Sequence, residues 1–470
     1  MNEKYKYLGK NTIIFAISSF GTKILAFLLV PLYTAVLSAA EYGTADLITT
    51  TSTLLMYILT INIASSVLRF TMDHRGYAEN VLSYGFRVLN VGTLLCGFIL
   101  GIVAQSNTID WPIYYYIFIV LYFYASALYE MITNYLRAID RVKEVAMAGV
   151  LSSLAIILSN ILFLLIMRVG LVGYLVSIVL GPLLASVFCI IKADVSIKTY
   201  FHVDCSKAVR REMVKYCTPL IFNNLALWIN AFLDRYFVTY YCGIAENGIY
   251  SVAGKIPTIL STCYSVFASA WTLSAIIEFD PEDNDGFFSN TYNTYGALMT
   301  IACSMIILIN IPLAHFLYAK EFFVAWRYSS ILLLSVMFNT LTVFQGSVFT
   351  AAKKTKSVAT TTVISAIVNT VLNAILIPIC GALGAAIATA FSYFVMWAVR
   401  YQFSKEFIMM RVNVKKDLLI YAIIVIQIAF EHMNSHFYFG QLFCFIGIVL
   451  INKNYICPIV KTFMRKIAKR

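Results

Sequence analysis

The sequence predicts an all-α membrane protein with about fourteen transmembrane helices, built as two parallel six-helix lobes around a central cavity plus two C-terminal helices. Of the 470 residues, 60% are hydrophobic and only 12% are charged, and the mean hydropathy is +0.80. A soluble protein of this size needs more charge to cover its surface. Apolar runs of about 20 residues recur along the whole chain, and a helix of that length crosses a bilayer core of roughly 30 Å.

The apolar runs follow one another in three groups. The first six spans are expected at residues 11–34, 45–69, 81–104, 112–135, 146–167 and 171–193. After a basic segment, six more are expected at 217–241, 252–276, 291–312, 328–351, 358–379 and 382–403. The last two runs are shorter, at 417–432 and 437–452. The expected division is therefore an N-lobe (1–193), a basic cytoplasmic linker (194–216), a C-lobe (217–403) and a C-terminal helix pair with a basic tail (404–470).

The net charge of +12 has a topological explanation. Lysine and arginine concentrate between alternate apolar runs and at both ends of the chain, as the positive-inside rule predicts for cytoplasmic segments. We therefore expect cytoplasmic N- and C-termini and no nucleic-acid partner. The ten cysteines are scattered without a CxxC pair, so neither a disulfide framework nor a metal site is expected.

One acidic segment, FDPEDNDG at residues 279–286, contains Asp283-Asn284-Asp285, a pattern found at nucleotide-sugar metal sites. No soluble domain surrounds it, so the sequence favours a solvated cytoplasmic loop. The loops expected outside are all short, which argues against an enzyme that carries its chemistry on an extracytoplasmic loop.

An internal repeat relates the two halves of the chain. AEYGTADL at residues 40–47 is echoed by AENGIYSV at 245–252, and the segment 159–176 is echoed by 372–388. In the second pair, three residues align with three others: Asn160 with Asn373, Gly170 with Gly381, and Gly173 with Gly384. Six helices per unit is an even number, so both halves enter the membrane from the same face, as in parallel transporter repeats.

Polar residues line one face of several expected spans. In span 1, Lys23 lies near mid-membrane, where a lysine costs roughly 2.5–3.5 kcal/mol on insertion scales. Spans 2, 7 and 8 carry further polar stripes, and these should face a hydrated cavity between the lobes. Candidate cavity residues are Lys23, Tyr57, Arg87, Asn223, Trp228, Asn230, Arg235 and Lys255, with Asp46, Glu130 and Asp234 as acidic members. A cavity with more cations than acids suits an anionic substrate, and Tyr57 and Trp228 offer aromatic faces for sugar rings.

At its N-terminal end the chain resembles a known family. Lys23 and Pro31 in span 1, LSAAEYGTADL at residues 37–47 and VLRFTMD at residues 67–73 look like the Wzx-type polysaccharide flippases of the multidrug/oligosaccharidyl-lipid/polysaccharide exporter superfamily. The resemblance implies no enzyme activity and no cofactor. It implies alternating-access transport of a polyisoprenyl-pyrophosphate-linked oligosaccharide to the outer leaflet of a bacterial cytoplasmic membrane, for O-antigen, capsule or exopolysaccharide synthesis.

By the same resemblance, the cations contact pyrophosphate or acidic sugars, and the acids couple transport to a proton or sodium gradient, as in an antiporter. The cations are Lys23, Arg87, Arg235 and Lys255, and the acids are Asp46, Glu130 and Asp234. Membrane lipid is an expected partner and polysaccharide polymerase machinery is a further one. Two alternatives are a cation-coupled multidrug exporter of the same superfamily and a membrane-embedded glycan polymerase or ligase.

Overall fold

The computed structural model describes residue 23 and residues 27–106, 110–195, 205–433 and 438–467. These residues form helices and connecting turns without a strand, which confirms the all-α prediction. The chain divides into two compact units, Met1–Tyr236 and Phe237–Arg470. In the described residues nine helices are long and apolar enough to cross a membrane, or ten if one bent pair counts as a span. The total of fourteen spans stays a prediction.

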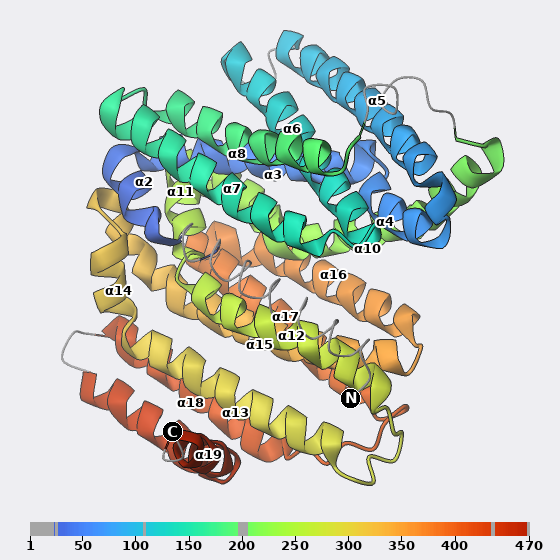
Figure 1. The fold of residues 1–470 in the computed structure, drawn as a ribbon. Helices are drawn as coiled ribbons and strands as arrows, with labels where there is room; N and C mark the ends of the chain where they lie inside the picture. The colour runs from blue at the N-terminus through green and yellow to red at the C-terminus, as the bar shows by residue number, and fades with distance from the viewer. Residues whose placement is uncertain (1–22, 24–26, 107–109, 196–204, 434–437, 468–470) are drawn as a thin grey trace. The chain divides into compact units, whose positions relative to one another are not determined.

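Unit 1 is built from the helices α2 (Val30–Val36), α3 (Ala39–Leu59), α4 (Ile63–Asp73), η1 (Arg75–Tyr77), α5 (Ala78–Gln105), α6 (Ile113–Ala138), α7 (Val142–Asn160), the π-helical η2 (Ile161–Ile166) and α8 (Leu171–Lys192). The helix α10 (Lys207–Cys242) begins in unit 1 and ends in unit 2. Within unit 1, α6 packs against α3, α4, α5, α7 and α8, so it is the central helix of this unit (Figure 1).

Unit 2 continues with α11 (Ile244–Ala253), α12 (Pro257–Ile277), α13 (Phe287–Leu308), α14 (Asn310–Leu317), η3 (Lys320–Ala325), α15 (Trp326–Ala351), α16 (Thr355–Cys380), α17 (Ala382–Ser404), α18 (Val414–Met433) and α19 (Tyr438–Ile467). Here α15 is the central helix and contacts α12, α13, α16, α17 and α18. The C-terminal helices α18 and α19 lie beside α13 (Figure 1).

The structure supports the internal repeat by conformation as well as by sequence. Gly170 and Gly381 precede α8 and α17 with nearly the same backbone angles, φ 66° and ψ −139° against φ 60° and ψ −145°. Both positive φ values favour glycine. Asn160 and Asn373 are both fully buried. The first copy has two more residues between its asparagine and its glycine, and these fall beside the π-helical segment η2, whose wider turns hold more residues.

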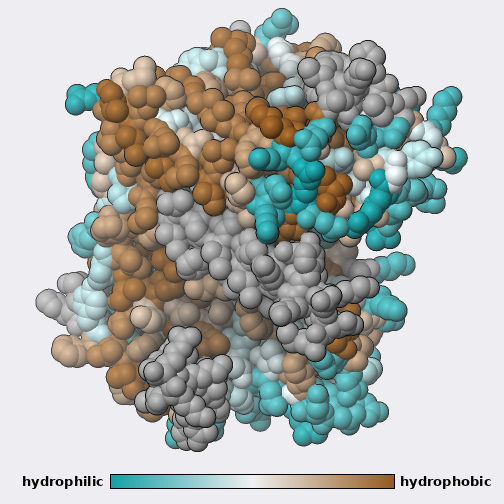
Figure 2. Space-filling view, viewed as in Figure 1, coloured by the Kyte–Doolittle hydropathy of each residue, from teal (hydrophilic) through white to brown (hydrophobic). Residues whose placement is uncertain are grey.

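The helices that follow the central helix of each unit present matching apolar stripes. On α7 the exposed residues include Val150, Leu154, Leu158, Leu162 and Ile166 (the last two in η2), and on α16 they include Val363, Ile367, Val371, Ile375 and Ile379. Each residue of the second stripe follows its partner by 213 residues, the offset that also relates Asn160 to Asn373. Figure 2 shows hydrophobic side chains gathered over α7 and α8. A helix face this apolar and this exposed is suited to lipid.

Span 2, expected to be one helix, is broken in the structure. The segments α3 and α4 meet at an angle of 49°. Between them, Ile61 and Asn62 have φ values of 48° and 55°, a conformation that is strained for a β-branched isoleucine. Span 8, expected at 252–276, corresponds to α12, and the turn at residues 254–256 separates it from α11. A span broken as span 2 is broken is typical of transporter binding regions.

Close packing by Gly92 accompanies the break in span 2. A Cβ atom at Gly92 of α5 would lie 2.8 Å from the carbonyl oxygen of Leu59, which is backbone and cannot turn aside. We therefore expect Gly92→Ala to destabilise the protein by about 1–3 kcal/mol, as overpacking does. Gly97→Ala on the same helix is the matched control, because a Cβ there meets nothing within 4 Å. Thermal unfolding of the purified protein measures both, and equal melting temperatures for the two variants would contradict the close packing.

Candidate functional site

An ion pair between α3 and α10 brings together two candidate residues of unit 1. The guanidinium of Arg235 pairs with the carboxylate of Asp46, and the exposed fractions of the two side chains are 20% and 9%. Arg235 also donates to the hydroxyl of Thr50 at 3.4 Å and lies over the ring of Phe232. In this conformation Asp46 neutralises Arg235, so an anionic substrate would have to compete with that carboxylate.

Aromatic side chains extend the seam between α3 and α10. The indole N–H of Trp228 donates to the carbonyl oxygen of Thr50 at 3.3 Å, and Trp228 is only 4% exposed. At the next residue of α3, the hydroxyls of Thr51 and Tyr236 are 2.7 Å apart. The seam therefore holds α3 and α10 together through an ion pair and hydrogen bonds, in a buried setting where each lost bond is expensive.

A second polar group lies where span 2 is broken. Tyr57, Thr60 and Asn62 line a cavity of about 10 Å³ together with Glu130 of α6. A cavity of this size holds about one water molecule. The structure thus brings Tyr57 and Glu130, two candidates from different spans, to the same point of unit 1.

The other candidate residues lie outside these two groups. Asn223, Asn230 and Asp234 are on α10, and of these Asn230 and Asp234 are buried. The Asn230 amide donates to the carbonyl of Ala226 at 3.0 Å, a contact within the helix. Lys23 is exposed, Arg87 is half-buried on α5, and Lys255 is half-buried in unit 2, in the turn between α11 and α12.

Arg400 and Glu431 are buried charged residues that the sequence analysis missed. Arg400 of α17 is 5% exposed and donates to the hydroxyls of Thr361 and Thr362, each at 3.0 Å, and to the carbonyl of Thr342 at 2.6 Å. None of the carboxylates in the described residues forms an ion pair with it. Glu431 of α18 is 3% exposed. Both residues fall inside expected spans. Because charges at membrane depth are rare, that position alone could have identified them as candidates.

The acidic segment 279–286 has a structural role that corrects one part of the expectation. Asp283 is buried, whereas a solvated loop was expected, and its carboxylate accepts the backbone N–H groups of Phe288 and Ser289, each at 2.9 Å, at the start of α13. The backbone N–H groups of Asn284 and Glu282 hold the pKa of the exposed Asp280 below its ordinary value. In the part of the chain that the structure describes, no group of three His, Cys, Asp or Glu side chains is arranged to hold a metal ion.

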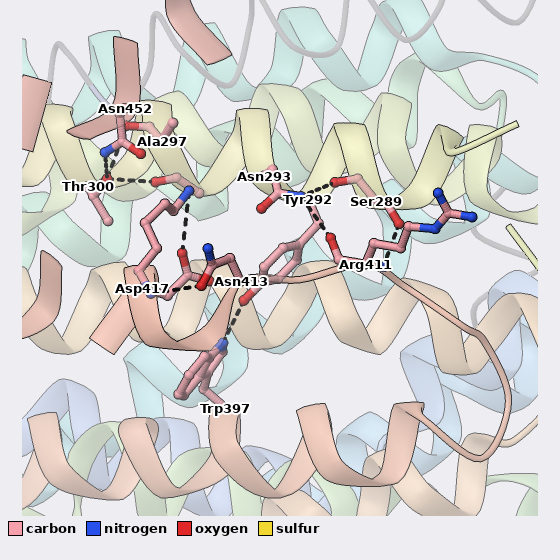
Figure 3. Close-up of polar contacts among 12 residues, drawn as sticks. Ser289, Tyr292, Asn293, Ala297, Thr300, Trp397, Arg411, Asn413, Asp417 and Asn452 are labelled. Carbon is pink, nitrogen blue, oxygen red and sulfur yellow. Dashed lines mark hydrogen bonds and ion pairs between the residues drawn. The ribbon is translucent and has the colours of Figure 1, made fainter. Parts of the chain in front are cut away.

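Polar contacts attach the C-terminal helices to the rest of unit 2 (Figure 3). The Asn452 amide of α19 donates to the hydroxyl of Thr300 on α13 at 3.3 Å. The Asn293 amide of α13 donates to the carbonyl of Arg411 at 3.2 Å, just before α18 begins. The helices α18 and α19 are thereby held in a fixed position against α13.

An apolar groove of about 680 Å³ runs between α15, α17 and α18. Its lining is almost entirely hydrophobic and includes Leu334, Phe338, Phe391, Phe394 and Val425. At one end the groove shares Leu383 and His432 with a second cavity of about 700 Å³. The second cavity is more polar and is lined by Trp326, Arg327, Tyr328, Glu431 and His432 among others.

Comparison with known proteins gives a family and a fold. Residues 8–272, more than half of the chain, match the model of the family described as "Polysaccharide biosynthesis protein". No curated protein matches the sequence.

Solved structures match over most of their length. The lipid II flippase MurJ in an inward closed conformation has a TM-score of 0.72 at 16% identity, covering 95% of this chain and all of that one. An inward-facing multidrug resistance MATE transporter of the MOP superfamily has a TM-score of 0.67 at 12% identity, covering 83% and 97%. A MOP superfamily transporter from Pyrococcus furiosus has a TM-score of 0.60 at 12% identity, covering 85% and 96%. At these identities the likeness shows the fold.

Proposed function

Because this chain belongs to the polysaccharide biosynthesis protein family, we propose that it is a flippase for a polyisoprenyl-pyrophosphate-linked oligosaccharide. The substrate moves from the cytoplasmic to the outer leaflet of a bacterial cytoplasmic membrane, where it supplies surface polysaccharide synthesis. The chain lies in that membrane as a multi-pass protein with both termini in the cytoplasm. A proton or sodium gradient drives the alternation between inward-open and outward-open states.

The apolar groove between α15, α17 and α18 is the observation that carries the proposal. It offers about 680 Å³ lined by side chains such as Phe338, Phe391 and Phe394. Burying apolar surface contributes about 25 cal/mol per Å², so a long isoprenoid chain gains substantially from such a groove. The head group takes a different route, because each unpaired sugar hydroxyl costs about 4–8 kcal/mol in hydrocarbon. A substrate with an isoprenoid tail and a polar head uses both kinds of surface.

The leaflet that holds the lipid-linked oligosaccharide tests this function. In a strain that lacks the protein, the oligosaccharide should accumulate on the inner leaflet, protected from a membrane-impermeant sugar-modifying probe, and surface glycan should be lost. Accumulation on the outer leaflet would indicate a polymerase or ligase instead. Drug sensitivity without accumulation would indicate a multidrug exporter.

Replacing Lys23 tests the cationic path of the head group. We expect Lys23→Ala to lower export roughly tenfold or more, because a cation and a phosphate about 4 Å apart attract by roughly 4 kcal/mol at an effective dielectric of 20. Lys23→Arg should retain most of the activity. Lys207→Ala, at an exposed position at the start of α10, is the control for general loss of positive charge. Surface glycan and protein level are measured together. Normal export by Lys23→Ala at a normal protein level would show that Lys23 does not contact the head group.

A further inference from the structure

Glu431 is a buried carboxyl group with few donors around it. Its side chain is 3% exposed, and Oε1 accepts a hydrogen bond from the Asn310 amide at 2.7 Å. Oε2 is buried without a hydrogen-bond partner among the described residues. The side chains that interact with the carboxyl group, Asn310 and Ser330, are neutral hydrogen-bonding groups. An ionised carboxylate accepts several hydrogen bonds, so this environment supplies fewer hydrogen-bond donors than the charged form needs.

Asn310, the first residue of α14, adds a second unsatisfied oxygen at the same place. Its amide nitrogen donates to Glu431 and to the carbonyl of Trp326 at 3.0 Å, which fixes the orientation of the amide. Its Oδ1 atom is fully buried, again without a partner among the described residues. One added proton would stabilise two neighbouring buried oxygens that lack donors. A protonated carboxyl group can donate a hydrogen bond as well as accept one.

The charged and titratable groups near Glu431 are engaged elsewhere. The ring nitrogens of His432 lie 2.9 and 3.0 Å from the carbonyl oxygens of Ile428 and Arg327. The guanidinium of Arg327 lies over the ring of Trp326, 5.7 Å from its centroid.

Among the described residues of the neighbouring helices, no cation forms an ion pair with Glu431. The hydroxyl of Tyr328 donates to Glu246. The ring of His315 on α14 packs against Phe323, with centroids 4.3 Å apart. On α18, Gln427 lies one turn before Glu431. It accepts a hydrogen bond at 2.5 Å from Ser304 of α13, which is also neutral.

We infer that Glu431 is a proton-binding site, supplied with protons through the cavity of about 700 Å³ that it lines with Arg327 and His432. A hard divalent cation takes six or more oxygen ligands, and the two unsatisfied oxygens here fall well short of that number. The proton moves between water in the cavity and Oε2 of Glu431, and no other bond changes.

The site lies where proton binding can alter helix packing. Asn310 stands at the break between α13 and α14, and Glu431 joins it from α18. With a proton bound, the α14–α18 contact is neutral. Loss of the proton leaves a buried charge that requires water or new donors, which favours separation of the two helices. If the chain is a gradient-driven flippase, as proposed above, Glu431 is a coupling residue for protons.

Infrared spectroscopy of the purified protein at neutral pH tests the site directly. The carbonyl stretch of a protonated carboxylic acid should be present in the wild type, weaker in Glu431→Gln and unchanged in Glu406→Gln, whose side chain is exposed. Glutamine keeps the shape of the protonated acid, so both variants should fold, which their elution profiles check. Equal band intensity in the wild type and Glu431→Gln, or a band that is missing from the wild type, overturns the inference.

The transport arm is read separately, in vesicles that contain the lipid-linked oligosaccharide. We expect an imposed pH gradient to stimulate the wild type and Glu406→Gln, but not Glu431→Gln, while a sodium gradient alone has no effect on any of them. Equal stimulation of all three proteins refutes the coupling role. If no protein transports the substrate but the infrared band depends on Glu431, the proposed function fails and the proton site stands.

Discussion

Replacing Asp46 with alanine is expected to lower the free energy of unfolding by about 1–3 kcal/mol, because the change breaks a partly buried ion pair to a charged group. The change leaves the guanidinium of Arg235, whose side chain is 20% exposed, without its carboxylate. The hydroxyl of Thr50 remains as a neutral acceptor, at 3.4 Å, and compensates only in part. Thermal unfolding of the purified protein in one detergent, at one pH, measures the loss.

A surface ion pair in the same unit supplies the matched control. Arg69 and Asp73 are 2.9 Å apart on α4, four residues from each other, with side chains 60% and 40% exposed. Exposed pairs of this spacing contribute only roughly 0.3–0.5 kcal/mol, so Asp73→Ala should leave the melting temperature nearly unchanged. If Asp46→Ala and Asp73→Ala have the same small effect, the α3–α10 pair does not stabilise unit 1.

The double variant Asp46→Asn with Arg235→Gln separates pairing from simple loss of charge. Each single change removes one partner of a partly buried ion pair, whereas the double change removes both charges and keeps side chains of similar shape. The double variant should therefore be more stable than the sum of the single effects predicts, by an interaction energy of about 0.5–3 kcal/mol. Strict additivity would mean that the two side chains do not interact in solution.

The helices were predictable because their signal is local, and the breaks were not. Apolar runs of the right length placed α6, α8, α15 and α17 close to their observed bounds. The apolar sequence around Ile61 and Asn62 does not predict a left-handed turn. That conformation depends on how α5 packs against this segment. Residues 207–216, expected in a basic linker, form the first turns of the continuous helix α10.

Candidate residues were found by their unusual depth, but their partners required the structure. Asp46 and Arg235 stand 189 residues apart, and one sequence holds no sign that they meet. The same limit explains the wrong expectation for Asp283. Its neighbours Asn284 and Asp285 suggested a solvated or metal-binding loop, whereas its carboxylate caps the helix that follows. Contacts of that kind follow from backbone geometry, which residue types alone do not specify.

Truncation of Arg400 is expected to destabilise unit 2 strongly, because its guanidinium joins three helices. It donates to Thr361 and Thr362 on α16 and to the carbonyl of Thr342 on α15, from its own place on α17. Hydrogen bonds to charged groups contribute about 1.5–3 kcal/mol each, and alanine also leaves a cavity. Arg400→Ala should therefore lower the free energy of unfolding by several kcal/mol, on the order of 3–5.

The same type of residue at an exposed position distinguishes this effect from loss of charge. The side chain of Arg411 is exposed, and the described contacts of this residue use its backbone N–H and carbonyl, so Arg411→Ala should be nearly neutral. Arg400→Lys should restore only part of the stability, because an ammonium group lacks the planar fork that reaches both threonines and the carbonyl together. Full restoration by lysine would show that charge, rather than the fork geometry, holds α15, α16 and α17 together. Equal melting temperatures for Arg400→Ala and Arg411→Ala would show that the side chain of Arg400 does not hold these helices together.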